Sequence, residues 1–166
     1  MSRYCVIDFE TTGLSPHECE VIEFAAVKVV NGEIGLNLAS LCRPHGYISP
    51  QITRITGITP YMTEGYPPFD EFLPLLLDFI GNDILVAHNI PFDWGFLSNY
   101  CARAQKEYNP EKLCTLQLSR RNLKELKSHS LGSVSEYLNI PNPAAHRALG
   151  DAMTTAGVLI KLLEYV

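Results

Sequence analysis

The sequence predicts an α/β fold in which a mixed five-stranded sheet carries helices on both of its faces. Three observations favour this class. Strand-like segments come first along the chain, strand–helix units follow them, and a long apolar-rich helical segment comes last. Consecutive strands joined by short turns pair antiparallel, whereas strands separated by a helix pair parallel. We therefore expect three antiparallel strands followed by parallel βα units.

The first part of the chain supplies the antiparallel strands. Residues 3–10 begin apolar and then alternate, which is typical of a strand whose last residues emerge at an edge or a cleft. Residues 20–30 and 33–42 are strand-like on either side of Asn31-Gly32, the pair that most strongly indicates a short hairpin. The Pro- and Gly-containing stretch after residue 42 is expected to be a connection.

The later part of the chain supplies helices and buried strands. Residues 69–80 place apolar side chains at helical spacing between Pro67-Pro68 and Gly81. Residues 84–87 predict a short buried strand, and Pro91 suits the first turn of the helix that follows. Three more elements are expected, namely a strand at 113–116, a helix at 130–138 and a closing helix at 148–165. The chain has no repeat or linker, so residues 1–166 are expected to form a single domain.

The composition is that of an ordinary globular protein, with 46% apolar and 19% charged residues. No run approaches the roughly 20 apolar residues that cross a bilayer, and no secretory signal is found, so we expect a cytoplasmic protein without a membrane partner. Five scattered cysteines lack metal-site spacing and are expected to be small buried hydrophobes. The net charge of -5 argues against a non-specific nucleic-acid coat. It is compatible with a nuclease, because metal-holding carboxylates make a chain acidic.

Asp8 and Glu10 are the first candidate site residues. Alternation along a strand puts both carboxylates on one face and Phe9 on the other. Two carboxylates in one small volume repel each other, so such pairs are tolerated chiefly where a cation is bound or a proton is shared. An isolated pair of this kind is more often solvated surface. Here Thr11-Thr12-Gly13 follows directly, and the complete pattern Asp-x-Glu-Thr-Thr-Gly is rarely found by chance. A metal site is therefore the favoured interpretation.

Two later motifs accompany this first one. They are His88-Asn89-Ile90-Pro91-Phe92-Asp93 and His146-Arg147-Ala148-Leu149-Gly150-Asp151-Ala152. Alone, Asp93 and Asp151 would be ordinary acids at helix starts, and His146 a solvated loop residue. Together with Asp8-Phe9-Glu10-Thr11-Thr12-Gly13, however, they make the sequence resemble the DnaQ-like exonucleases, which include the proofreading subunit of bacterial replicative polymerase. The resemblance runs from Val6 to the final helix, and His146 in place of tyrosine indicates the histidine branch, called DEDDh.

This resemblance implies a ribonuclease H-like fold and a metal-dependent 3′→5′ exonuclease that releases nucleoside 5′-monophosphates. Two Mg²⁺ or Mn²⁺ ions are implied as cofactors, since oxygen ligands favour these hard cations. Asp8 would bridge both ions, Glu10 and Asp151 would ligate the ion on the side of the nucleophile, and Asp93 would act directly or through water. His146 would be the general base, because neutral imidazole accepts a proton near physiological pH.

The substrate is expected to be the 3′ end of a single-stranded nucleic acid. The resemblance assigns substrate binding to Thr11, Leu14, Ile55, Thr56 and Phe92, whose apolar atoms can contact base faces. A basic stretch, made of Arg120, Arg121, Lys124 and Lys127, could follow the incoming strand, although a solvated helix face is the stronger interpretation. For His88 the resemblance implies a structural or orienting role, and His17, His45 and His129 are expected at the surface.

Several functions stay open at this point. A freestanding exonuclease acting on single-stranded DNA is the first expectation, and an RNA-trimming exoribonuclease is the main alternative because one catalytic centre serves both sugars. A proofreading subunit acting within a polymerase complex, with a polymerase or repair partner, is a further alternative. A binding module without catalysis is disfavoured because all five chemical residues are retained.

The spacing of the last two site residues makes one further prediction. Five residues turn through roughly 140° on an ideal helix, so a continuous helix cannot aim His146 and Asp151 at the same point. We expect Asp151 in the first turns of the closing helix and His146 on a more mobile segment before it.

Overall fold

The structure is a computed structural model that describes residues 2–166. One sheet has the strand order β3-β2-β1-β4-β5. The strands are β1 (Arg3–Thr11), β2 (Val21–Val30), β3 (Glu33–Leu41), β4 (Ile84–Ala87) and β5 (Lys112–Cys114). The first three pair antiparallel, whereas β4 runs parallel to β1 and β5 parallel to β4. The predicted mixed five-stranded sheet is confirmed.

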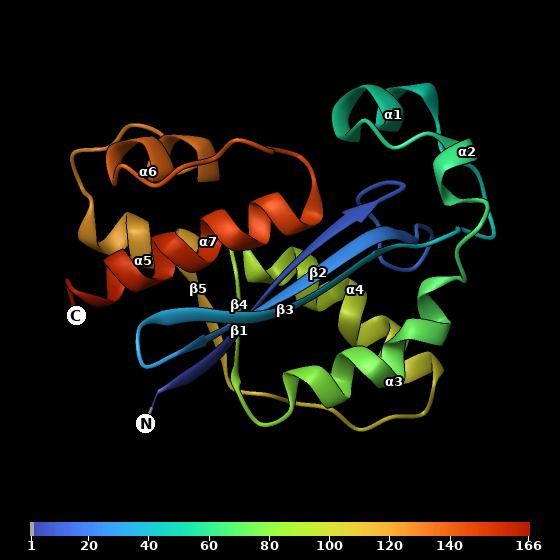
Figure 1. Cartoon of the computed structure of the whole chain (residues 1–166), viewed down its shortest axis with the longest axis horizontal. Helices are drawn as coiled ribbons and strands as arrows, with labels where there is room; N and C mark the ends of the chain where they lie inside the picture. The colour runs from blue at the N-terminus through green and yellow to red at the C-terminus, as the bar shows by residue number, and fades with distance from the viewer. Residues whose placement is uncertain (1) are drawn as a thin grey trace.

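Helices cover both faces of this sheet (Figure 1). They are α1 (Pro50–Thr56), α2 (Pro60–Thr63), α3 (Phe69–Ile80), α4 (Ile90–Arg103), α5 (Thr115–Asn122), α6 (Leu131–Tyr137) and α7 (Ala148–Leu163). In Figure 1 α3 lies on one side of the strands and α7 lies on the other, with α5 and α6 beside α7. The short helix α1 stands beyond the arrowhead of β1, at the edge where the candidate site residues emerge.

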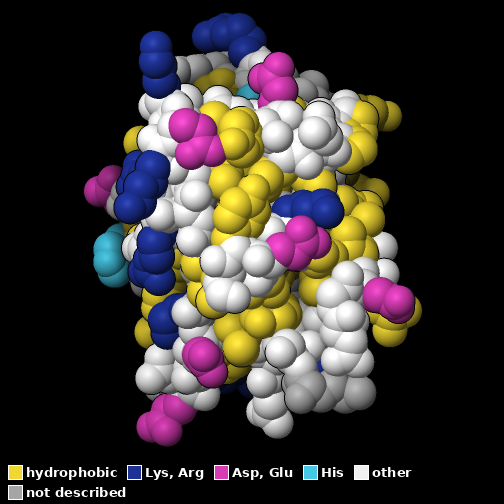
Figure 2. Space-filling view, turned by 90° about the vertical axis from the view of Figure 1, so that its left-hand side faces the viewer, with side chains coloured by type: hydrophobic (Ala, Val, Ile, Leu, Met, Phe, Trp, Pro, Cys, Tyr) yellow, Lys and Arg dark blue, Asp and Glu magenta, His cyan; other side chains and the backbone are white. Residues whose placement is uncertain are grey.

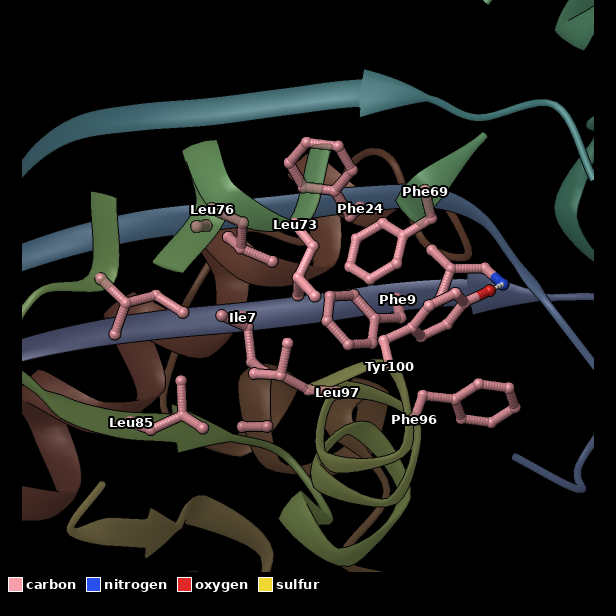
Figure 3. Packing of buried hydrophobic residues seen from close by; sticks show 14 of the residues in the cluster. Ile7, Phe9, Phe24, Phe69, Leu73, Leu76, Leu85, Phe96, Leu97 and Tyr100 are labelled. Carbon is pink, nitrogen blue, oxygen red and sulfur yellow. Dashed lines mark hydrogen bonds between the residues drawn. The ribbon is translucent and has the colours of Figure 1, made fainter. Parts of the chain in front are cut away.

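The larger core lies between the sheet, α3 and α4. Figure 3 shows Phe9 of β1 and Phe24 of β2 meeting Phe69 of α3, with Tyr100 of α4 beside them. The ring centroids of Phe69 and Tyr100 are 4.6 Å apart in an edge-to-face arrangement, which is a favourable geometry for aromatic pairs. The Tyr100 hydroxyl accepts a hydrogen bond from the backbone N–H of Val21 at 3.1 Å. This core therefore holds the second half of β1 rigidly in place.

The opposite core is built from smaller side chains. Ala148, Ala152 and Ala156 recur every four residues along α7 and pack against Val6 and Ala25 of the sheet. Because alanine has only a methyl side chain, the helix axis can come close to β1 and β2. The start of α7 is thus held near the end of β1.

The differences from prediction lie mainly in short helices. The expected connection after residue 42 contains α1 and α2, whose starts are capped by the side-chain oxygens of Ser49 and Thr59. The expected strand at 113–116 is wrong in its second half, because α5 begins at Thr115. The closing helix ends at Leu163 rather than at 165. Short helices bury few side chains, so periodicity reveals them poorly.

Two broader expectations concern membranes and cysteines. In the part of the chain that the structure describes, no helix has both the length and the apolar character needed to cross a membrane. All five cysteines are free. Cys5, Cys42, Cys101 and Cys114 are buried and Cys19 is half-buried against the larger core, as expected of small hydrophobes.

Candidate active site

The end of β1 presents Asp8 and Glu10 on the sheet face that α7 covers. Phe9 between them points into the aromatic core on the other face (Figure 3), as the alternation predicts. The strand register places Asp8 opposite Ala25 and Glu10 opposite Glu23 of β2. The register then shifts between Glu10 and Thr11, where the regular pairing of the strand is interrupted.

The first turn of α7 adds a third carboxylate. Asp8, Glu10 and Asp151 each offer an oxygen, and these oxygens lie within 4.8 Å of one another. Asp8 Oδ2 is buried and has no hydrogen-bond partner. A buried carboxylate oxygen without a partner is costly, and a cation would satisfy it. The all-oxygen donor set therefore fits a hard divalent cation such as Mg²⁺ or Mn²⁺.

Asp93 lies beside this cluster rather than within it. It occupies the first turn of α4 and is only 4% exposed. Its Oδ1 accepts a hydrogen bond from the backbone N–H of Phe9 at 3.1 Å, which ties α4 directly to β1. Its negative charge helps to raise the pKa of Asp8, so the two carboxyl groups are close neighbours. Asp93 is therefore placed to act on the Asp8 side of the site.

Burial is the largest cause that raises the pKa values of Asp8, Glu10, Asp93 and Asp151. For Asp8 and Glu10 the neighbouring acids raise the pKa further, and the pKa of Glu10 reaches about 8. Without a cation, burial therefore shifts all four groups toward their protonated forms. A bound divalent cation would favour the ionised forms instead.

His146 lies on the segment that precedes α7. Its side chain is exposed, its φ of 66° lies in the left-handed region, and its backbone N–H donates to Asp151 Oδ2 at 3.0 Å. The expected separation, with Asp151 in the first turn and His146 before the helix, is confirmed. That the segment is more mobile stays a prediction.

The segment before α7 crosses close over the helix. A Cβ at Gly150 would lie 2.6 Å from the carbonyl oxygen of Ala144, so this crossing requires glycine. Further along α7, the hydroxyl of Thr154 donates to the carbonyl of Pro141 at 3.0 Å. The segment that carries His146 is therefore attached to α7 at two points.

A groove of about 480 Å³ opens beside Glu10. It is lined by the 9–14 turn, by α1 and by Phe92, and its lining includes all five predicted substrate residues, Thr11, Leu14, Ile55, Thr56 and Phe92. The side chains of Leu14 and Ile55 are 85% and 50% exposed, so apolar atoms are free to contact a ligand. The hydroxyls of Thr11 and Thr56 instead donate to backbone carbonyls and hold the local turns.

His88 contacts α5 and the loop after it. Its Nδ1 lies 2.9 Å from Thr115 Oγ1, and its Nε2 lies 2.8 Å from the carbonyl oxygen of His129, to which it must donate. These bonds join the end of β4 to two later segments, in keeping with an orienting role. The expectation that His129 is a surface residue is wrong, because it is half-buried and its ring bonds to Ser119.

The basic stretch does not form one track toward the site. All four of its side chains, those of Arg120, Arg121, Lys124 and Lys127, are exposed. Arg121 lines a cavity with Tyr4 and Ile84, which stand at the starts of β1 and β4 and thus at the edge opposite the carboxylates. Figure 2 shows the side of the molecule that lies at the left of Figure 1, where hydrophobic side chains form a central band. This arrangement fits a solvated surface better than a basic stretch that follows the incoming strand.

Two site residues were not predicted from the sequence. The buried Glu23 of β2 accepts hydrogen bonds from the guanidinium of Arg147, and Nη2 lies 2.6 Å from Glu23 Oε2. The available signal was a carboxylate within the otherwise apolar run Val21-Ile22-Glu23-Phe24-Ala25. A charge in a buried strand indicates a specific partner.

The raised pKa values predict that the metal-free protein loses stability as pH rises. The folded state binds more protons than the unfolded state between the unperturbed pKa of Glu10, 4.5, and its folded value of about 8. This stabilisation is complete below the lower value and is lost through the higher one. Urea unfolding in chelator from about pH 5 to about pH 8.5 should show the decline, and Glu10→Gln should reduce it. Parallel pH profiles for the two proteins would contradict the assignment.

Known proteins resemble this chain in sequence and in fold. Residues 5–159 match the family model described as Exonuclease. DNA polymerase III subunit epsilon of Aquifex aeolicus is 40% identical over 163 residues, which are 97% of this chain and 80% of that protein. A PolC-type DNA polymerase III of Thermotoga petrophila is 40% identical over 164 residues, but this chain spans only 12% of its length.

Solved structures of exonucleases have a similar fold. Exonuclease X in complex with 5′ overhanging duplex DNA matches with a TM-score of 0.80 and 31% identity, over 97% of this chain and 91% of that one. Exonuclease I shares the fold with a TM-score of 0.85 at 19% identity, over 99% of this chain and 43% of that one. The three motifs, the five-stranded sheet and these relatives together show that the chain belongs to the DnaQ-like exonuclease family.

Proposed function

We propose that this protein is a DEDDh-type 3′→5′ exonuclease that removes nucleoside 5′-monophosphates one at a time from the 3′ end of single-stranded DNA. The observation that carries the proposal is the cluster of Asp8, Glu10 and Asp151, in which one buried oxygen lacks a partner. A groove with exposed apolar side chains begins beside Glu10, one of these carboxylates. Family membership supplies the reaction class.

The carboxylates would hold two Mg²⁺ or Mn²⁺ ions. Asp8, Glu10 and Asp151 are the nearest donors to one another, and Asp93 extends the set on the Asp8 side. When bound, such cations neutralise charge on the phosphate and orient it for in-line hydrolysis. The protein itself contributes a fixed arrangement, because β1, α4 and α7 each bring their acids on regular secondary structure.

His146 would act as the general base at one of its ring nitrogens. Its exposed ring stands free of side-chain partners among the described residues, while its backbone N–H holds it next to Asp151. An imidazole in this position can take a proton from the attacking water and pass it to solvent. The groove residues Leu14, Ile55 and Phe92 would pack on sugar and base faces, which favours digestion with little sequence preference.

The likeness to two polymerase III proteins supports a second proposal, that the domain works beside a DNA polymerase or a repair partner. In that setting it would remove mismatched 3′ ends. The single-domain organisation over residues 1–166 and the cytoplasmic location stay predictions.

Digestion of end-labelled single strands tests the reaction. With Mg²⁺, DNA labelled at its 3′ end should release a labelled mononucleotide first, and chelator should stop the release. Asp8→Asn and Asp151→Asn should abolish turnover while the protein stays folded, because each removes a metal ligand and relieves repulsion. Asp78→Asn, an exposed acid in α3, is the matched control. Early release of a 5′-terminal mononucleotide, or wild-type rates in both variants, would overturn the proposal. Faster digestion of RNA of the same sequence would redirect it to an exoribonuclease.

His146→Ala tests the base. Turnover near neutral pH should fall by about 10²–10⁴-fold, the usual contribution of a general base, while metal binding measured by calorimetry stays unchanged. His45→Ala, an exposed histidine outside the site, is the control and should keep full activity. If the rate of His146→Ala and the acid limb of its pH–rate profile both match those of the wild type, His146 has no part in the mechanism.

A further inference from the structure

Glu23 is a buried carboxylate that belongs to neither the metal cluster nor the groove. It stands on β2 at 6% exposure and meets donors from the start of α7. Arg147 approaches it through two nitrogens, with Nε 3.0 Å from Oε1 and Nη2 2.6 Å from Oε2. The backbone N–H of Ala148 adds a third bond, 2.8 Å to Oε1. The carboxylate is thus fully bonded.

These contacts act at the N-terminus of α7. The first N–H groups of a helix lack partners within it, and here the residue before the helix, Arg147, makes no side-chain cap of its own. Glu23 supplies the acceptor from a strand, and its charge suits the positive end of the helix dipole. Ala148 is also packed against the sheet. The helix start is therefore attached to β2 by both hydrogen bonds and packing.

The attachment point lies between two proposed catalytic residues. His146 immediately precedes Arg147, and Asp151 follows Ala148 by less than one helical turn. The end of β1 also lies close to Glu23, because Glu23 pairs with Glu10 across β1 and β2. One carboxylate therefore connects the strand that carries Asp8 and Glu10 to the helix that carries Asp151.

The presence of Glu23 at this position is informative because a buried carboxylate beside other acids has an electrostatic cost. Glu23 adds a negative charge beside an acidic cluster, where an apolar side chain would avoid repulsion. Arg147 offsets that charge, and its guanidinium is occupied by Glu23 in a bidentate arrangement. Glu23 engages Nε and Nη2 of this guanidinium, and the side chain is otherwise partly exposed.

We propose that Glu23 and Arg147 form a positioning pair that sets Asp151 and His146 relative to Asp8 and Glu10. The pair touches no reacting atom. It works by fixing the start of α7, so that the third carboxylate and the base reach their places without substrate. This inference rests on the proposed function, which assigns catalysis to Asp151 and His146.

Steady-state kinetics and Mn²⁺ calorimetry without substrate test the pair together. Glu23→Ala should lower kcat by about 10²-fold, the scale expected from a misplacement near 1 Å, with KM changed little. It should also weaken Mn²⁺ binding, because Asp151 is no longer held. Glu23→Gln should recover part of both, since its amide oxygen still accepts from Ala148 and from Arg147 Nε, whereas the bond from Nη2 is lost. Arg147→Ala should have the same effects as Glu23→Ala. Because the Arg147 side chain is partly exposed, this variant provides the test if Glu23→Ala does not fold.

The control is Asp83→Ala. Asp83 is equally buried at 6% exposure and binds Arg3 and Lys28 before β4, at the edge opposite the site. Its loss should lower thermal stability while kcat and Mn²⁺ binding stay at wild-type values. Wild-type kcat in folded Glu23→Ala, or an equal loss of kcat in Asp83→Ala, would overturn the proposal. A raised KM with normal kcat in Arg147→Ala would assign the arginine to phosphate binding instead. An inactive wild-type protein would refute the proposed function, while Mn²⁺ binding would still test the pair.

Discussion

Repulsion among carboxylates at the end of β1 is the constraint on which the rest of the site depends. Asp8, Glu10 and Asp151 approach within 4.8 Å, and Asp93 and Glu23 stand close by. The surrounding structure offsets part of this cost. Asp93 and Asp151 each lie in the first turn of a long helix, where the dipole favours negative charge. The backbone N–H groups of Phe9 and His146 donate to the same two acids.

The two faces of β1 have separate tasks. Phe9 enters a core of large aromatic rings between the sheet, α3 and α4, and this packing fixes the strand. Asp8 and Glu10 face α7, which carries alanines that let it approach closely. Without the rigid aromatic layer, the acids could separate and relieve their repulsion. We infer that the packed core holds the acids together, that proton uptake lowers their repulsion without metal, and that a bound cation would favour their ionised forms.

Much of this arrangement could be predicted because it depends on local patterns. Strand alternation placed Asp8 and Glu10 on one face, and helical geometry placed Asp151 inside α7 with His146 before it. What could not be predicted depends on pairing between distant segments. Glu23 contacts Arg147, which lies 124 residues later in the sequence, and no local pattern predicts that contact. The helices α1 and α5 escaped prediction because neither shows a long apolar periodicity.

We infer that these carboxylates hold divalent cations for phosphodiester hydrolysis. Anomalous diffraction from crystals grown with Mn²⁺ and a nucleoside 5′-monophosphate tests it most directly, because the scattering identifies manganese without reference to activity. We expect manganese bound by Asp8, Glu10 and Asp151, with Asp93 beside it and the nucleotide in the groove formed by the 9–14 turn and α1. Crystals with an occupied groove but no manganese at these carboxylates, or with manganese held elsewhere, would contradict it.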